Sequence, residues 1–164
     1  MRNAVLRQIY RAGFRVLWVS SFVVKPRKRG AKCALFNDGE VLLVRHTYGP
    51  REWELPGGGL DRSEDPLSGI RREIREELSV EITQFTELGT GVGRGRFAGA
   101  CVSYFSAELP DRTLRPDPVE IAEVAWWSPA GLPTPLGWHA AQLLARHGEA
   151  LASRPSDPGS PERG

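Results

Sequence analysis

Apolar residues along the chain fall into short runs that end in turn-forming residues. The runs Ala31–Phe36 and Val41–Val44 flank Asn37-Asp38-Gly39, a sequence typical of a tight turn, so they predict a β-hairpin. Further apolar runs predict three more strands, over Val80–Leu88, Phe97–Leu109 and Ile121–Trp127. The middle part of the chain is therefore expected to build a β-sheet.

Two other segments repeat their apolar residues at helical spacing. In the first, Ser63 is a candidate N-cap and Pro66 fits a first turn, where its missing N–H costs little. The apolar positions that follow are Leu67, Ile70, Ile74 and Leu78. The second helix is predicted over Trp138–Leu151. One helix between strands and one after them indicate a mixed α/β domain rather than a helix bundle or a β-sandwich.

The two ends of the chain differ from this body. Residues 1–29 form a basic arm with amphipathic helical spacing, and residues 153–164, with three prolines and no apolar residue, predict a disordered tail. The apolar run of the arm is shorter than the ~18 residues of a membrane span and precedes no cleavage site, so we expect neither a span nor a signal peptide. Its apolar stripe is expected to pack on the domain or in a homodimer. The alternative is contact with an anionic membrane surface or RNA.

Charge and cysteine content narrow the classes further. The 164 residues suit one domain, expected over residues 30–152, and carry a net charge of +2. The first 32 residues hold nine Lys and Arg and no acid, which leaves 13 basic against 20 acidic residues, a net of −7, for the rest. Cys33 and Cys101 lie in apolar strands and are expected in the core; two cysteines are too few for a disulfide scaffold and predict a cytoplasmic protein.

The first predicted helix carries a cluster of acidic residues. Glu73, Glu76 and Glu77 are three and four positions apart, so their carboxylates leave the same side of the helix. By itself such a cluster is usually a solvated helix face. Here the glycine-rich loop Leu55–Gly59 precedes it and can bring backbone close to a ligand. Loop and carboxylates together offer the hard oxygen ligands that Mg²⁺ or Mn²⁺ prefers.

At these residues the chain resembles the Nudix hydrolases, whose signature is G-x5-E-x7-R-E-U-x-E-E-x-G-U with U a bulky aliphatic residue. The matching residues are Gly58, Glu64, Arg72, Glu73, Ile74, Glu76, Glu77 and Val80. The one departure is Ser79, which stands where the family has glycine at the end of the helix. That glycine is expected to adopt a left-handed backbone, so Ser79 should cost some strain without removing a metal ligand.

The resemblance implies an α/β/α sandwich with a mixed sheet, and it implies a role for each matching residue. The implied ligands of Mg²⁺ or Mn²⁺ are Glu76 and Glu77, then Glu73, the Gly57 carbonyl and Glu64, the last through water or as support for the loop. Arg72 would position the glutamates. The family often recruits a distal glutamate as base or ligand. Glu120, six residues before a tryptophan, is the first candidate and Glu123 the second.

Substrate contacts are expected in the segment that leads to the glycine loop. The candidates are Arg45, Tyr48, Arg51 and Trp53, since arginine binds phosphate oxygens and an aromatic ring stacks on a base. His46 in the same segment is no evidence of catalysis by itself. The glycine-rich stretch 89–96 satisfies G-x-G-x-x-A, but a strand rather than a helix follows it, so a flexible hairpin loop is expected instead of a dinucleotide site.

The resemblance implies a Mg²⁺- or Mn²⁺-dependent pyrophosphohydrolase that cleaves a nucleoside diphosphate linked to another group. Two alternatives stay open. One is an enzyme acting on an RNA 5′ end, held by the basic arm. The other is a catalytically silent Nudix module that senses a nucleotide or acts as a scaffold. The retention of every glutamate of the signature argues against the silent module.

Overall fold

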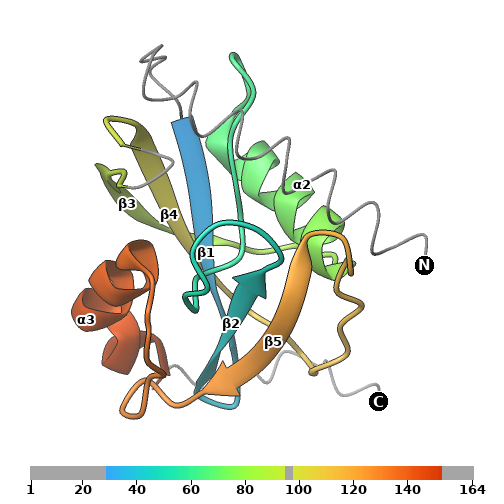
Figure 1. Cartoon of the computed structure of the whole chain (residues 1–164), viewed down its shortest axis with the longest axis vertical. Helices are drawn as coiled ribbons and strands as arrows, with labels where there is room; N and C mark the ends of the chain where they lie inside the picture. The colour runs from blue at the N-terminus through green and yellow to red at the C-terminus, as the bar shows by residue number, and fades with distance from the viewer. Residues whose placement is uncertain (1–28, 95–97, 153–164) are drawn as a thin grey trace, which may run out of the picture.

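A computed structural model describes residues 29–94 and 98–152 (Figure 1). The elements follow the order β1 (Arg29–Asn37), β2 (Glu40–His46), α2 (Pro66–Leu78), β3 (Thr86–Val92), β4 (Cys101–Glu108), β5 (Ile121–Trp127) and α3 (Trp138–Ala152). The predictions for the arm, apart from Arg29, and for the tail lie outside the described residues.

The strands form one mixed sheet in the order β3-β4-β1-β2-β5. β1 and β4 are parallel, and the other neighbouring strands are antiparallel. β1 and β2 pair beside their turn, where Asn37 faces Glu40, which confirms the predicted hairpin. Further along, residues 54–58 lie between the two strands: the Cys33 amide donates to the Pro56 carbonyl at 3.1 Å, and Val44 pairs with Glu54. The glycine loop is thus part of the sheet.

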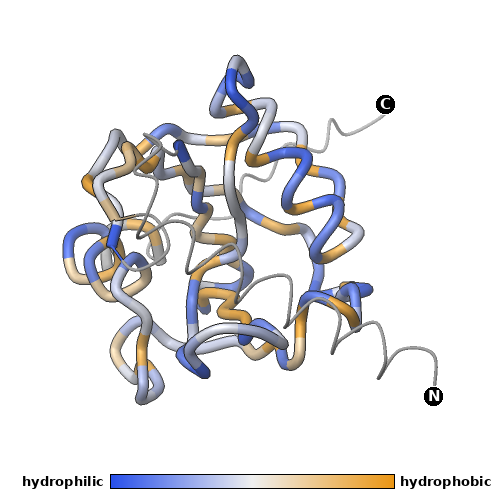
Figure 2. The backbone as a smooth tube through the Cα atoms, turned by 45° about the horizontal axis from the view of Figure 1, so that its top comes forward, coloured by the Kyte–Doolittle hydropathy of each residue, from blue (hydrophilic) through white to orange (hydrophobic). Residues whose placement is uncertain are grey.

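The two helices cover opposite faces of this sheet (Figure 1). On one face Ile70, Ile74 and Leu78 of α2 pack on strand residues that include Cys33 and Leu35. On the other, Ala140, Leu143 and Leu144 of α3 pack on residues that include Ala34 and Phe36. Along α2, hydrophobic residues recur between hydrophilic ones, as expected for a helix with one buried face (Figure 2). The α/β class and the α/β/α sandwich are confirmed.

Both ends of α2 are fixed by local chemistry. The N-cap is Asp65, whose carboxylate accepts a hydrogen bond from the Ser68 amide at 2.9 Å. The prediction of Ser63 is therefore wrong. The helix begins at Pro66, so the residue directly before it, Asp65, is the one that can cap its first turn. At the other end Ser79 has φ 57° and ψ 37°. The left-handed backbone expected at this position is confirmed.

The strands after α2 begin later than the sequence predicts. β3 runs over Thr86–Val92 instead of Val80–Leu88, because Ile82 packs on the α2 face before the chain joins the ladder. Gly89, predicted in a hairpin loop, lies within β3 with φ 100°, at a register shift against β4 that its backbone freedom allows. β4 covers Cys101–Glu108, shorter than the predicted Phe97–Leu109, whereas β5 is confirmed and α3 ends one residue later than predicted.

Two residues expected in the core lie at the surface. Leu67 is 39% exposed because α2 turns its first residues away from the sheet, and Cys101 is exposed at the first position of β4. Cys33 is buried as predicted. Within the described residues no helix is long and apolar enough to cross a membrane.

Candidate functional site

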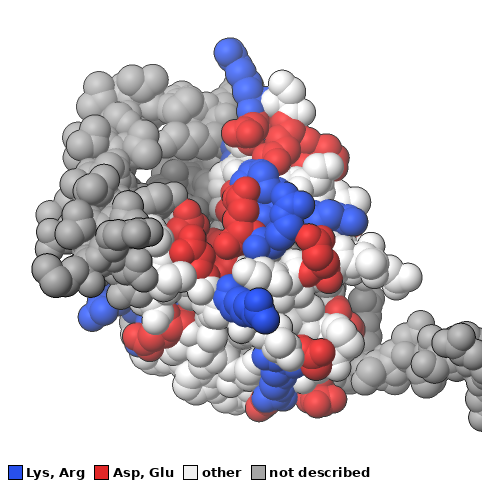
Figure 3. Space-filling model, turned by 90° about the vertical axis from the view of Figure 1, so that its right-hand side faces the viewer, with Lys and Arg blue, Asp and Glu red and all other residues white. Residues whose placement is uncertain are grey.

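The acidic cluster of α2 is organised around one arginine. The Arg72 guanidinium donates two bonds to the Glu64 carboxylate, each 2.9 Å, and further bonds to Glu73 at 2.8 Å and Glu76 at 3.1 Å. It also donates to the Gly59 carbonyl at 3.2 Å. These bonds lower the pKa of Glu64 to about 2 and raise that of Arg72. Acidic and basic side chains accordingly interleave on this side of the molecule (Figure 3).

Glu77 differs from its neighbours because it is buried. Its side chain is 2% exposed, and Oε2 accepts from the Gly57 amide at 2.8 Å. Oε1 lies 4.0 Å from Nδ1 of His46, the histidine that the sequence left without a role. α2 therefore directs one carboxylate into the interior beside the glycine loop and leaves two at the rim with Arg72.

The chemistry of these groups fits a divalent cation. Burial raises the pKa of Glu73, although Arg72 acts against this shift, so the charged form of this carboxylate is poorly solvated and a bound cation would stabilise it. Glu73, Glu76 and Glu77, with the Gly57 carbonyl, supply the oxygen donors that Mg²⁺ and Mn²⁺ take. In the side-chain positions of residues 29–94 and 98–152, no three His, Cys, Asp or Glu already converge on one point. Binding of an ion by all three glutamates thus requires Glu73 and Glu76 to turn from Arg72 toward Glu77.

The glycine loop is also held by a lysine. In the sequence this residue is one of the nine basic residues among the first 32, and no separate role was predicted for it. Lys32 lies in β1, is 2% exposed, and donates from Nζ to the carbonyls of Leu55 at 2.8 Å and Gly57 at 2.7 Å. The predicted metal ligand Gly57 therefore has one carbonyl lone pair occupied. The signal for Lys32 was in the sequence, as a charge inside the apolar run Ala31–Phe36.

The two distal glutamates are placed differently. Glu120 precedes β5, and its carbonyl accepts from the Thr47 amide at 2.8 Å, directly after His46. Its backbone therefore lies at the same end of β2 as His46 and Glu77. Glu123 forms an ion pair with Arg45 at 3.3 Å. This pairing favours Glu120 over Glu123 for a role beside Glu77.

The predicted substrate contacts divide into two groups. The guanidinium of Arg45 lies 4.4 Å from the ring centroid of Trp53, which is 7% exposed and packs on Trp127, so the Trp53 ring is not open to a ligand as it stands. Tyr48 is half-buried with its ring 5.2 Å from that of His46, and Arg51 is exposed. Of the two aromatic candidates, Tyr48 is therefore the one whose ring lies beside His46, the neighbour of Glu77.

The start of the glycine loop is joined to α3. The Glu54 carboxylate accepts from the Leu55 amide at 2.9 Å and from the Ala140 amide, in the first turn of α3, at 2.8 Å. Nearby, the Tyr104 hydroxyl lies 2.8 Å from Nδ1 of His139, and burial together with the Glu54 charge raises the pKa of Tyr104 to about 12. The loop is thus fixed at Glu54 by α3 and at Gly57 by Lys32 and Glu77.

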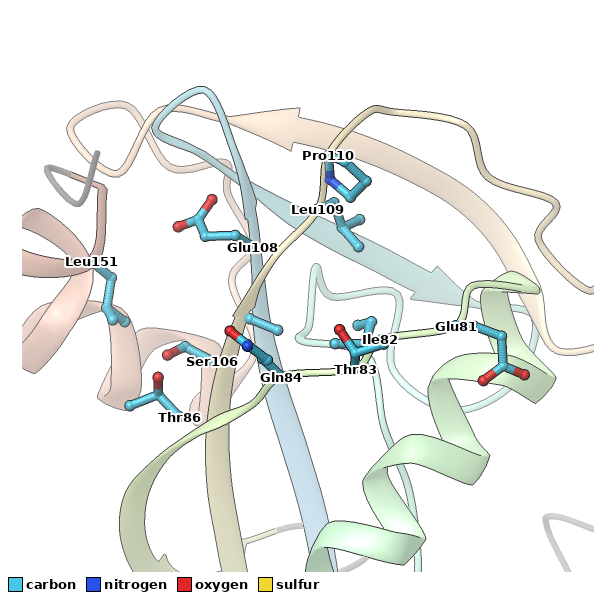
Figure 4. Close-up of a pocket in the computed structure, with 11 residues that line it drawn as sticks. Glu81, Ile82, Thr83, Gln84, Thr86, Ser106, Glu108, Leu109, Pro110 and Leu151 are labelled. Atoms are coloured by element: carbon cyan, nitrogen blue, oxygen red, sulfur yellow. The ribbon is translucent and has the colours of Figure 1, made fainter. Parts of the chain in front are cut away.

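A cavity of about 350 Å³ lies at the other end of β1 (Figure 4). Its lining includes Ile82, Gln84, Ser106, Glu108 and Leu151. None of the residues predicted for the site lines this cavity. The predicted metal-ligating glutamates and Arg72 lie together at the acidic cluster and not at this cavity.

Comparisons with known proteins identify the family of the chain. The family model described as the NUDIX domain matches residues 26–147. The chain is 27% identical over 117 residues to the NAD-capped RNA hydrolase NudC of Vibrio atlanticus, covering 68% of this chain and 42% of that protein. It is 32% identical over 94 residues to an RNA pyrophosphohydrolase of Gluconacetobacter diazotrophicus, covering 52% and 49%. The structure of a MutT NUDIX hydrolase from Burkholderia pseudomallei is similar, with a TM-score of 0.65, 25% identity, and coverage of 72% of this chain and 95% of that one. The chain spans less than half the length of these curated relatives.

Proposed function

Because the chain belongs to the NUDIX domain family, we propose that it is a Mg²⁺- or Mn²⁺-dependent pyrophosphohydrolase acting on a nucleoside diphosphate linked to another group. One observation carries the proposal. The carboxylate of Glu77 is buried, bonded to the Gly57 amide, and on the same helix as Glu73 and Glu76. A buried carboxylate next to two others is costly for a purely structural site and suits one that takes up cations.

In this proposal Glu73, Glu76 and Glu77 hold the cation with the Gly57 carbonyl. A bound Mg²⁺ or Mn²⁺ offsets the charge of the diphosphate and lowers the pKa of a bound water. Arg72 bridges the two rim carboxylates and orients them, and Glu64 fixes Arg72 through its two-bond pair. Glu120 is the proposed base. It would accept a proton from the attacking water as the new bond to phosphorus forms and the diphosphate P–O bond breaks.

Substrate phosphates meet Arg51, which is exposed in the segment before the glycine loop. Arg45 reaches them when its pair with Glu123 opens. Tyr48 offers a ring for stacking, and Trp53 serves this purpose after Arg45 leaves its ring. The homodimer and the cytoplasmic location expected from the sequence stay predictions.

The experiment that tests the proposal is release of phosphate or monophosphate from a panel of nucleotide diphosphate derivatives with Mg²⁺ or Mn²⁺. Glu77→Gln is expected to lose at least about 100-fold in kcat, the upper end of what the loss of a supporting residue costs a metal site. The matched control is Glu87→Gln, a change of an exposed glutamate on β3. A folded Glu77→Gln as active as the wild type contradicts the proposal. If the wild type and Glu77→Gln are equally inactive on every substrate of the panel, the result favours the silent nucleotide-sensing or scaffold module.

A second candidate is hydrolysis at an RNA 5′ end, favoured by the two relatives named for RNA substrates. In this candidate the basic arm holds the RNA. Replacing Lys25, Arg27 and Lys28 by glutamine is then expected to weaken activity on 5′-triphosphate RNA more than on free nucleotides. The wild-type activity on RNA is expected to fall more steeply as salt rises. Equal loss on both substrates argues against this candidate and leaves the arm to an anionic membrane surface or a second copy of the chain.

A further inference from the structure

Lys32 is a charged residue enclosed by a strand that otherwise packs apolar side chains. Its neighbours Ala31, Cys33 and Ala34 are fully buried, and Lys32 itself is 2% exposed. Taking an ammonium group out of water costs several kcal/mol unless hydrogen bonds replace the lost hydration. An apolar side chain would fill this place on β1 without that cost. Packing alone therefore does not explain why a charged residue occupies this position.

The hydrogen bonds of Lys32 indicate a role in holding the glycine loop. Nζ donates to Leu55 O at 2.8 Å and to Gly57 O at 2.7 Å, two carbonyls of the loop that leads into the acidic cluster. Charge-assisted bonds of this length are stronger than bonds between neutral groups. Lys32 therefore ties the loop to the centre of the sheet from a strand that pairs rigidly with β4.

Gly57 connects Lys32 to Glu77. The Gly57 carbonyl accepts from Lys32, and the Gly57 amide donates to Glu77 Oε2 at 2.8 Å. Its φ is 116°, and a side chain here would collide with the Ala31 carbonyl oxygen, so the position admits glycine. One residue is thus fixed on its two sides by a buried cation and a buried anion.

We propose that Lys32 is a positioning residue for the cation-binding carboxylates, acting on Glu77 through the Gly57 backbone. The proposal rests on the proposed function, because it assigns the acidic cluster to a divalent cation. Lys32 fixes the direction in which the Gly57 amide meets Glu77. The same ammonium acts against the rise that burial causes in the pKa of Glu73, so its field reaches a second carboxylate of the cluster.

Charge and positioning predict opposite results when Lys32 is removed. An ammonium beside a cation site repels the cation, so a pure charge effect makes Lys32→Met bind the cation more tightly. Loss of positioning leaves two carbonyls without their donor and frees Gly57, so it makes binding weaker. The proposal commits to the second result.

The test is a titration of the metal-free protein with Mn²⁺, with free Mn²⁺ measured by electron paramagnetic resonance. Lys32→Met is expected to raise the Mn²⁺ dissociation constant by about 10-fold to 100-fold. The matched control is Asn37→Leu, at the other end of β1. It removes a buried hydrogen bond to the Leu109 carbonyl and leaves the glycine loop alone. This control is expected to lose stability and to keep the Mn²⁺ affinity of the wild type.

A second measurement is independent of the cation. Hydrogen exchange of the Gly57 amide, followed by NMR in the metal-free protein, is expected to be faster in Lys32→Met and unchanged in Asn37→Leu. Lys32→Gln, which keeps a donor, is expected to lie between wild type and Lys32→Met in both measurements, and it replaces Lys32→Met if that variant does not fold. Unchanged or tighter Mn²⁺ binding in a folded variant overturns the proposal. Wild type that binds no Mn²⁺ overturns the proposed function instead, while the Gly57 exchange rate still reports on Lys32.

Discussion

The helices α2 and α3 cover opposite faces of one sheet with similar apolar stripes, but they use polar residues differently. α2 gathers like charges that a single arginine holds together, with Glu64, Glu73 and Glu76 all bonded to Arg72. α3 instead sets His139 against the neutral hydroxyl of Tyr104 and takes its cap from Glu54, which directly precedes the glycine loop. Ion pairs that can exchange partners suit the proposed cation site on α2, whereas the contacts of α3 with Tyr104 and Glu54 hold it against the sheet and the loop.

This difference assigns separate effects to mutations on the two sides. Changes in the charges of α2 should act mainly on turnover, because the carboxylates there are the proposed chemistry. Changes around α3 should act mainly on stability, because its contacts hold the fold and the first residue of the loop. Four predictions test this division.

The largest effect is expected for Arg72→Met. The change leaves three carboxylates close together without their shared cation, so they repel one another and lose their orientation. We expect kcat to fall about 100-fold, as for the loss of a residue that orients metal ligands. Steady-state kinetics with Mg²⁺ measure this. The matched change on the α3 side is Tyr104→Phe, which removes the bond to His139 and should keep kcat within about threefold of wild type while unfolding at lower urea. A loss of turnover in Tyr104→Phe as large as that in Arg72→Met would break the division between the helices.

Much of this division is predictable from the sequence, because it depends on local spacing. The apolar positions Ile70, Ile74 and Leu78 define the buried stripe of α2, and the same spacing puts its glutamates on one side. The turn after Phe36 defines the hairpin in the same way. In each case residues a few positions apart carry the information, so no tertiary contact is needed to interpret them.

Contacts between residues far apart in the chain could not be predicted from the sequence. Lys32 stands out locally as a charge inside an apolar run, but the carbonyls it binds are 23 and 25 residues away, so the sequence does not show its partners. The late start of β3 has a similar cause, since Ile82 packs on the α2 face where alternation alone suggests a strand. The exposure of Cys101 depends on where β4 begins, which is also decided by its pairing with β1 and β3.

The next largest effect is expected at the cap of α3. Glu54→Ala removes the acceptor of the Ala140 and Leu55 amides, and loss of a helix cap costs about 1–2 kcal/mol of unfolding free energy. Glu54→Gln keeps an acceptor and should lose less. Asp65→Ala removes the corresponding cap of α2 and is the matched comparison. Urea unfolding measures all three. If Glu54→Ala is as stable as wild type, the loop does not cap α3 in solution.

A pH dependence should separate the two sides as well. The pKa of Glu64 is lowered from 4.5 to about 2 by its bonds with Arg72, so the pair stabilises the fold above pH 4.5 and its contribution is lost as the pH falls toward 2. The partly buried pair should be worth about 1 kcal/mol. We expect wild type to exceed Glu64→Gln in unfolding free energy at pH 6 and the difference to shrink steadily as the pH falls from 4.5 to 2. Tyr104→Phe should show no such narrowing in this range, because the raised pKa of Tyr104 moves its titration to about 12. A difference for Glu64→Gln that stays constant down to pH 2 contradicts the assignment.

The smallest effect is expected at Ser79, where α2 carries backbone strain in addition to charge. A left-handed backbone costs a residue with a Cβ about 1–2 kcal/mol, and glycine avoids this cost. Part of the gain is offset, because glycine loses more entropy on folding and the bond from the Ser79 hydroxyl to the Arg115 carbonyl disappears. Ser79→Gly should therefore raise the unfolding free energy by only about 0.5 kcal/mol, or the melting temperature by about 1–2 °C, with kcat unchanged. Ser79→Ala keeps the strain and loses the bond, so it should melt below wild type. If Ser79→Gly melts below wild type too, the hydroxyl bond outweighs the strain, and the end of α2 is held by its contact with residue 115.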